Sequence, residues 1–118
     1  MRFIKQDEIV EKKSRFIALR FELDELSEVD EILGELKAEH KKARHICFAY
    51  VFSRGVVNEK CSDAGEPKGT AGYPILNVIK RKNLTNTLIV VVRYFGGILL
   101  GAGGLTRAYT KATASVTD

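Results

Sequence analysis

Side chains near the start of the chain fall into two sets that alternate with a period of two. The stretch SRFIALRFEL (14–23) interleaves two apolar sets on opposite sides, and the stretch FIKQDEIV (3–10) precedes it after a charged break. A period of two is typical of β-strands, in which successive side chains point to opposite faces. The pattern therefore predicts two strands joined by a turn.

The period changes to that of a helix after residue 24. Apolar residues recur at helical spacing, acids fill the first turns and lysines follow at the end, as the helix dipole favours. Asp24 or Ser27 can cap the start of this helix. The pattern predicts an amphipathic helix whose charged face is solvated and whose buried stripe is formed by Leu26, Val29, Ile32, Leu33 and Leu36.

Two continuous apolar runs of strand length predict buried strands. They are HICFAYVF (45–52) and TLIVVVRYF (87–95). After a turn at 53–55, VVNEKCS (56–62) predicts an antiparallel partner of the first run. Pro67 and three glycines make 62–74 a loop.

Two further helices are predicted. Pro74 suits a first helical turn, so PILNVIKRKN (74–83) predicts a short helix that ends in basic residues and an Asn. From Ala102 the spacing predicts a last helix with an apolar face of Leu105, Ala108, Tyr109, Ala112 and Val116. The element order predicts an α+β fold, a two-layer sandwich with helices on one face of a mixed, mostly antiparallel sheet.

Length and composition fit one globular domain over residues 1–118. No apolar run approaches a membrane span, the charged N-terminus does not resemble a signal peptide, and two cysteines imply no disulfide framework. We therefore expect a cytoplasmic protein that does not use a membrane; its oligomeric state stays open. Residues 54–118 carry nine Lys and Arg against four acids, which points weakly toward nucleic acid or phosphate.

The stretch RYFGGILLGAGGLTRAY (93–109) holds the most conspicuous pattern. Its glycines are expensive to order, so bare backbone must be needed there. Amide groups at a helix start could receive an anion, but neither a P-loop nor a dinucleotide fingerprint is present. A tight strand-to-helix crossing against the 62–74 loop is the favoured interpretation for Gly96, Gly97, Gly101, Gly103 and Gly104.

Arg93 interrupts an otherwise apolar strand, so its charge needs a partner or solvent. An ion pair with Asp63 or Glu66 is one hypothesis, and a contact to phosphate or to a partner molecule is the other. Arg107 and Lys111 lie one turn apart on the last helix and could flank a bound anion.

Catalysis and metal binding have little support in the sequence. His45, Cys47 and Cys61 lack the spacing of zinc modules, and no motif joins an acid, a base and a nucleophile. We expect no enzyme activity, no metal and no cofactor.

Four motifs in this order resemble the IMPACT family, the YigZ-like proteins of bacteria: KSRFIA (13–18), HICFAY (45–50), SDAGEPKGTAGYPIL (62–76) and VVVRYFGGILLGAGGLTRAY (90–109). The resemblance is to the N-terminal domain of that family and implies a fold like the second domain of ribosomal protein S-five. Bacterial relatives usually add a C-terminal ferredoxin-like domain, which we expect this chain to lack. Ala64 and Lys68 stand where relatives usually carry an acid and a serine.

The resemblance also implies a role in translation or its regulation. Eukaryotic relatives restrain the amino-acid-starvation kinase by binding its activator, and bacterial relatives have been proposed to bind RNA or the ribosome. We expect a noncatalytic, translation-linked domain that docks to RNA, to the ribosome or to a translation-associated protein. The alternative is a small enzyme acting on a phosphorylated metabolite or nucleotide. The expected binding residues are Arg93, Gly96, Gly97, Gly101, Gly103, Gly104, Arg107 and Lys111, beside a loop formed by Asp63, Gly65, Glu66, Lys68, Gly69, Thr70 and Gly72.

Overall fold

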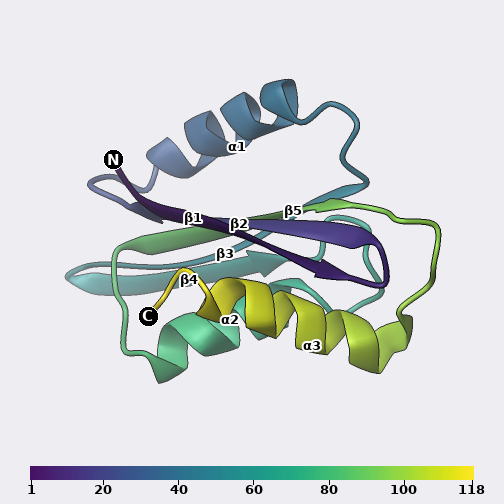
Figure 1. The fold of residues 1–118 in the computed structure, drawn as a ribbon. Helices are drawn as coiled ribbons and strands as arrows, with labels where there is room; N and C mark the ends of the chain where they lie inside the picture. The colour runs from purple at the N-terminus through teal and green to yellow at the C-terminus, as the bar shows by residue number, and fades with distance from the viewer.

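A computed structural model describes all residues, 1–118, and contains five strands and three helices in the predicted order (Figure 1). Each element falls within a few residues of the segment that the hydrophobic pattern predicts. The elements are β1 (Arg2–Glu11), β2 (Ser14–Glu22), α1 (Glu28–Glu39), β3 (His45–Arg54), β4 (Val56–Ser62), α2 (Gly72–Arg81), β5 (Thr87–Tyr94) and α3 (Gly101–Ala114).

The strands form one sheet in the order β1-β2-β5-β3-β4, and every neighbouring pair is antiparallel. The α+β class is therefore confirmed, while the expected mixed sheet contains no parallel pair. β5 lies at the centre, as its uninterrupted apolar sequence predicts, and is buried from Thr87 to Arg93. Its neighbour β3 places His45 directly opposite Arg93.

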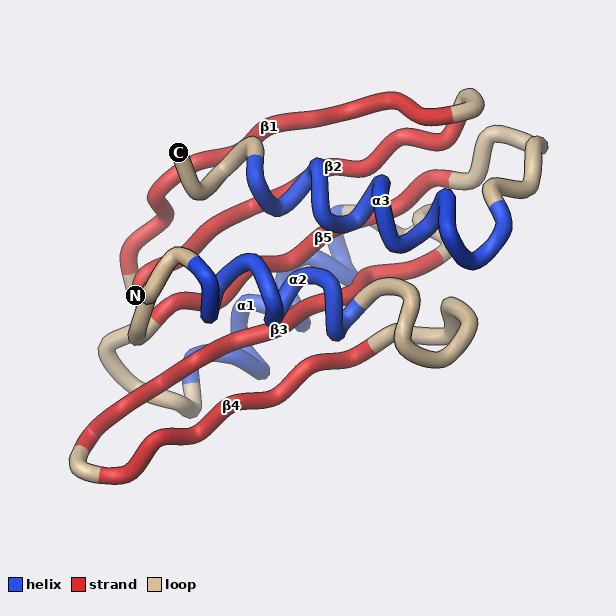
Figure 2. The backbone as a smooth tube through the Cα atoms, turned by 90° about the horizontal axis from the view of Figure 1, so that it is seen from below, coloured by secondary structure: helices blue, strands red, loops and turns tan.

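The helices do not share one face of the sheet, which corrects the predicted two-layer arrangement. Figure 1 shows α1 above the sheet and α2 and α3 below it, and Figure 2 shows α2 and α3 side by side across the lower face. The alternation along β2 and β5 is the reason. Ile17 and Leu19 face α1, whereas Phe16 and Ala18 face α2 and α3, so both faces are apolar and both need a cover.

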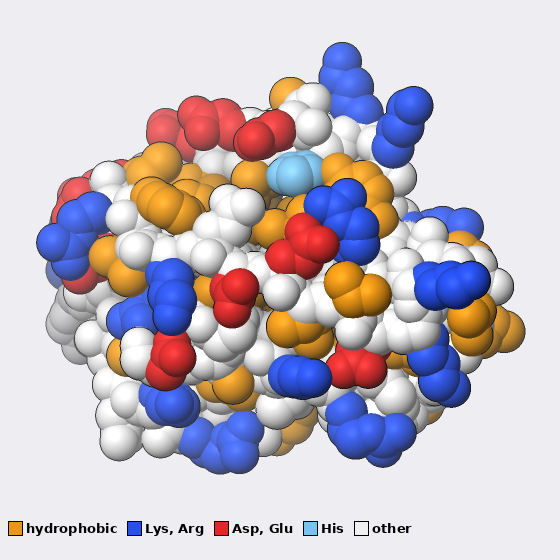
Figure 3. Space-filling view, in the orientation of Figure 1, with side chains coloured by type: hydrophobic (Ala, Val, Ile, Leu, Met, Phe, Trp, Pro, Cys, Tyr) orange, Lys and Arg blue, Asp and Glu red, His pale blue; other side chains and the backbone are white.

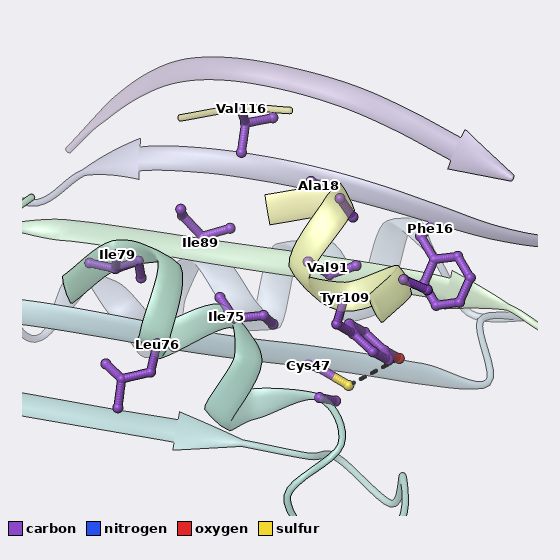
Figure 4. Close-up of a cluster of buried hydrophobic side chains, with 14 of the residues drawn as sticks. Phe16, Ala18, Cys47, Ile75, Leu76, Ile79, Ile89, Val91, Tyr109 and Val116 are labelled. Carbon is purple, nitrogen blue, oxygen red and sulfur yellow. Dashed lines mark hydrogen bonds between the residues drawn. The ribbon is translucent and has the colours of Figure 1, made fainter. Parts of the chain in front are cut away.

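Two cores result, one on each side of the sheet. The core under α1 includes Val29, Ile32 and Leu36 of that helix, packed on Phe21 and Val90. The other core joins α2 and α3 to the opposite face and is shown in Figure 4, where Ile75 and Tyr109 point toward the sheet. None of the three helices is long and apolar enough to cross a membrane.

Candidate functional site

A buried ion pair lies where the 62–72 loop meets the end of β5. The carboxylate of Glu66 accepts two hydrogen bonds from Nη1 of Arg93, at 3.0 and 2.8 Å, and both side chains are almost fully buried. Nε2 of His45 lies 3.3 Å from the same carboxylate. Of the two hypotheses for Arg93, the ion pair is confirmed, and Glu66 rather than Asp63 is its partner.

The remaining groups around this pair come from β2 and α3. The Tyr109 hydroxyl donates to Glu66 at 2.5 Å, and Nη2 of Arg93 donates to Oγ of buried Ser14 at 3.2 Å. The guanidinium of Arg93 also lies over the Phe16 ring, 5.4 Å from its centre. A buried charge pair is tolerated only when its other hydrogen-bonding groups are satisfied, and these contacts satisfy most of them.

Tyr109 and Cys47 are not available as anionic nucleophiles at neutral pH. Burial raises the pKa of the Cys47 thiol to about 12, and it also raises the pKa of Tyr109, with Cys47 and Glu66 adding to the effect. Figure 4 shows the two side chains meeting, with Sγ 3.4 Å from the phenol oxygen. Both groups remain protonated and act as packed, hydrogen-bonded parts of the core.

Asp63 holds the glycine-rich loop in shape. Its carboxylate accepts hydrogen bonds from the backbone amides of Gly69, Ala71 and Gly72, at 2.9, 3.1 and 2.8 Å. Burial alone would raise the pKa of Asp63, but these three amide donors outweigh burial and lower it. The loop residue Thr70 is buried, while Lys68 is exposed.

We expect Asp63→Asn to destabilise the domain at pH 7 by about 1–3 kcal/mol, because the amide replaces a charged acceptor of three hydrogen bonds. The lowered pKa means that the carboxylate stabilises the fold above its unfolded-state pKa of 3.8, and that this contribution is lost as the pH falls through the folded-state value. Urea unfolding between pH 7 and pH 2 should therefore show the difference narrowing toward acid. Glu35→Gln, an exposed α1 variant, is the matched control and should change little at any pH. A difference that stays constant down to pH 2 would contradict this role.

Four glycines of the site serve two different structural purposes, whereas Gly103 and Gly104 in the first turn of α3 would meet only side chains of Arg107 and Leu100. A Cβ on Gly96 would lie 2.1 Å from the backbone of Lys13, and a Cβ on Gly72 would lie 2.7 Å from the backbone of Ser62. Both therefore serve close packing. The favoured interpretation predicts a close approach at Gly96, but the neighbour is Lys13 of the β1–β2 turn rather than the 62–74 loop. Gly97 and Gly101 have φ angles of +90° and +75° and open space around them, so they serve the left-handed turn into α3.

A groove of about 360 Å³ opens beside the buried pair. Arg93 and Glu66 form part of its wall, and the first turn of α3 lies along it, where no side chain caps the helix. Figure 3 shows apolar and basic side chains interleaved at the end of the molecule where α3 begins. The other lining residues are Arg44, His45, Gly65, Pro67, Phe95, Leu99, Leu100, Gly101, Ala102 and Leu105.

The segment between β5 and α3 is unusually apolar for an exposed loop. Leu99 is 81% exposed, Ile98 42% and Phe95 36%. The guanidinium of Arg44 lies 4.8 Å from the centre of the Phe95 ring and forms no ion pair. We call this surface, formed by Arg44, Phe95, Ile98 and Leu99 with the groove, the α3 groove.

Arg107 and Lys111 do not belong to the α3 groove. They line a second depression together with Gly104, Glu11 and Lys12. Lys111 pairs with Glu11 at 3.2 Å, while Arg107 and Lys12 are exposed and unpaired. The predicted site is thus divided into the α3 groove, a structural loop and the basic side chains around this depression. We call these side chains, Lys12, Arg107 and Lys111, the basic ridge.

Sequence reasoning missed several parts of the site. Ser14 and Tyr109 complete the buried network, and Arg44 and Leu99 shape the open surface. The hydroxyl of a tyrosine on a buried helix face was the available signal for Tyr109, since such a group needs a partner. Arg44 and Leu99 carry no local pattern that marks them. No group of His, Cys, Asp and Glu in the structure could hold a metal ion.

The geometry defines an α+β domain in which the buried ion pair of Arg93 and Glu66 forms part of the wall of an open, partly apolar groove. The Impact N-terminal domain family model matches residues 12–117, so the chain belongs to this family. It is 47% identical over 109 residues to the IMPACT family member YvyE of Bacillus subtilis and 43% identical over 100 residues to YigZ of Escherichia coli. These alignments cover 92% and 83% of this chain but only 50% and 49% of those proteins, so the chain spans about half their length.

Two solved structures share the fold. A crystal structure described as a hypothetical protein is 37% identical with a TM-score of 0.89, and the match covers 98% of this chain and 56% of that one. The two-domain translational regulator Yih1 is 23% identical with a TM-score of 0.62, covering 97% of this chain and 45% of that one. The predicted family is confirmed, and the second likeness supports the fold.

Proposed function

We propose that this chain is a noncatalytic, translation-linked regulatory domain that acts by docking to a protein of the translation apparatus through the α3 groove. The observation that carries the proposal is the exposure of three large apolar side chains, Phe95, Ile98 and Leu99, on one short loop beside a groove. Contiguous exposed apolar surface commonly marks a protein-binding site. Family membership and the fold shared with a translational regulator favour a partner in translation.

RNA or ribosome docking is the second candidate, and the basic ridge favours it. Arg107 and Lys12 are exposed and unpaired next to α3, where a phosphate backbone could contact them. The ridge is small and lacks an exposed aromatic platform of its own, so it suits one or two phosphates. We expect any RNA affinity to fall steeply with salt, with a slope of about 0.7 per phosphate contacted, whereas protein docking through Leu99 should respond weakly.

The enzyme alternative finds no support in the chemistry of the groove. Its titratable neighbours are held in a closed network, and the nearby thiol and phenol stay protonated. We therefore keep the expectation of no catalysis and no cofactor, and we place the domain in the cytoplasm with its partner. A metabolite screen that found turnover would replace the docking proposal.

The experiment is density-gradient sedimentation of the purified domain in a translation-competent cell extract, followed by mass spectrometry of the fractions. We expect the parent to co-sediment with an identified translation protein or particle, and Leu99→Ser to weaken this association by about fivefold or more, because truncating an anchor side chain costs about 1–3 kcal/mol of binding. Val57→Ser, at a 64% exposed site on β4, is the matched control and should behave as the parent. Nuclease treatment separates RNA-dependent from protein-dependent migration.

The outcome that would overturn the proposal is a parent domain that stays at the top of the gradient, with the same distribution as Leu99→Ser. Loss of migration after nuclease treatment, with Leu99→Ser unaffected, would move the function to the basic ridge.

A further inference from the structure

We infer that the α3 groove recognises a short peptide segment in which an acidic side chain stands next to a large apolar one. This inference rests on the proposed docking function and names the chemistry of the partner. It depends on three features of the same surface: a free guanidinium, an uncapped helix start and exposed apolar side chains.

The net charge of the groove is positive because of Arg44, although the charges of Arg93 and Glu66 in its wall cancel. Arg93 and Glu66 neutralise each other at 2.8 Å in the wall. Arg44 has no carboxylate partner and is exposed, so its charge is available to an incoming group. A carboxylate is the natural complement, because a guanidinium can bind it through two parallel hydrogen bonds.

The first turn of α3 adds to this positive end. Gly101 and Ala102 line the groove, and the amides of a helix start have no partner within the helix. No side chain caps them, and α3 carries no acid in its first turn. The helix dipole favours a negative group at this point. In the same wall, Nε of buried Arg93 has no hydrogen-bond partner.

The apolar part of the surface selects a peptide over RNA. Leu99, Leu100 and Leu105 with Pro67 offer aliphatic contacts. The two aromatic rings of the groove are already engaged, since Phe95 lies against Arg44 and Nε2 of His45 lies 3.3 Å from the Glu66 carboxylate. RNA would need stacking rings and several cations in a row. An aliphatic wall beside one free guanidinium instead matches an apolar anchor with one adjacent carboxylate.

The test is selection of random dodecapeptides displayed on phage against the immobilised domain, followed by fluorescence polarisation with the selected peptides. We expect enrichment of sequences with Asp or Glu within three positions of Leu, Ile, Met or Phe. Arg44→Glu should weaken the selected peptide at least tenfold. Arg44→Lys keeps the charge but loses the two parallel hydrogen bonds, so it should weaken the peptide by less than Arg44→Glu does. Arg81→Glu, an exposed and unpaired arginine at the end of α2, is the matched control and should change affinity less than twofold.

Three results would overturn the inference: no enrichment, enrichment of sequences without an acid, or displacement of the peptide by an oligouridine dodecamer in an Arg44-dependent way. Loss of acid selection together with intact Leu99-dependent sedimentation would reject the acidic peptide while leaving the docking function standing. Folding of each variant is checked by its urea midpoint, since Arg44 makes no ion pair and its replacement should not unfold the domain.

Discussion

Replacing Glu66 with Gln is expected to destabilise the domain by about 3–5 kcal/mol, because the guanidinium of Arg93 would remain buried without a counter-charge. The change keeps the size of the side chain, so the loss reports charge and hydrogen bonding rather than a cavity. Urea unfolding at pH 7 measures it directly. A small domain has a total stability of about 5–15 kcal/mol, so this single substitution removes a large share.

The companion variants keep the prediction testable if the single variant fails to fold. The double variant in which Glu66 and Arg93 are each replaced by Met should lose less stability than the two single variants lose in sum. In the double variant neither charge is left buried without its partner. The control is the exposed pair of Glu8 and Arg15, where Glu8→Gln should cost at most about 1 kcal/mol. A parent-like midpoint for Glu66→Gln would show that the buried pair does not stabilise the fold.

Replacing Gly96 with Ala is expected to destabilise the domain by about 1–3 kcal/mol or more, because the new methyl group would overlap the backbone of Lys13. The atoms in its way are the carbonyl carbon and oxygen of the β1–β2 turn, at 2.1 Å, which cannot rotate aside. The turn or the start of the 95–100 loop must move. Chemical denaturation measures the loss of stability.

Gly34 provides a control of opposite sign. It lies in α1 with nothing within 4 Å of an added Cβ, so Gly34→Ala should stabilise the domain by about 0.5–1 kcal/mol through helix propensity. If both variants shift stability in the same direction, the crowding at Gly96 is not what requires a glycine there. If Gly96→Ala has the stability of the parent, packing does not require a glycine there, and Gly96 becomes a candidate ligand-binding residue again.

The segment containing Gly96 also shows how far sequence reasoning could go. The cost of ordering glycine says that bare backbone is needed at Gly96, Gly97 and Gly101, but local sequence cannot say which backbone approaches. The approach to Gly96 comes from Lys13, which lies more than eighty residues earlier in the chain. Only the packed fold brings the two together.

At Arg93, too, the sequence predicts that a partner is needed but not which residue provides it. A lone arginine in an apolar strand predicts a partner, and the nearby acids Asp63 and Glu66 were both reasonable. The choice between them depends on how the loop turns. Asp63 uses its carboxylate on three loop amides, and this turns Glu66 inward onto Arg93.

The sequence by itself determined the elements, because alternation and helical spacing are local consequences of where side chains point along a strand or helix. The sequence motifs also identified the family, and the single arginine in an apolar strand showed that Arg93 needs a partner. The tertiary structure alone decided that α1 covers the opposite face, that Tyr109 and Ser14 complete the ion pair, and that Arg44 and Leu99 border one groove. The two apolar sides of β2 show locally that both sheet faces need a cover, but which helix covers which face depends on strand order and helix placement. The other features join residues far apart in the chain, and no local pattern encodes their proximity.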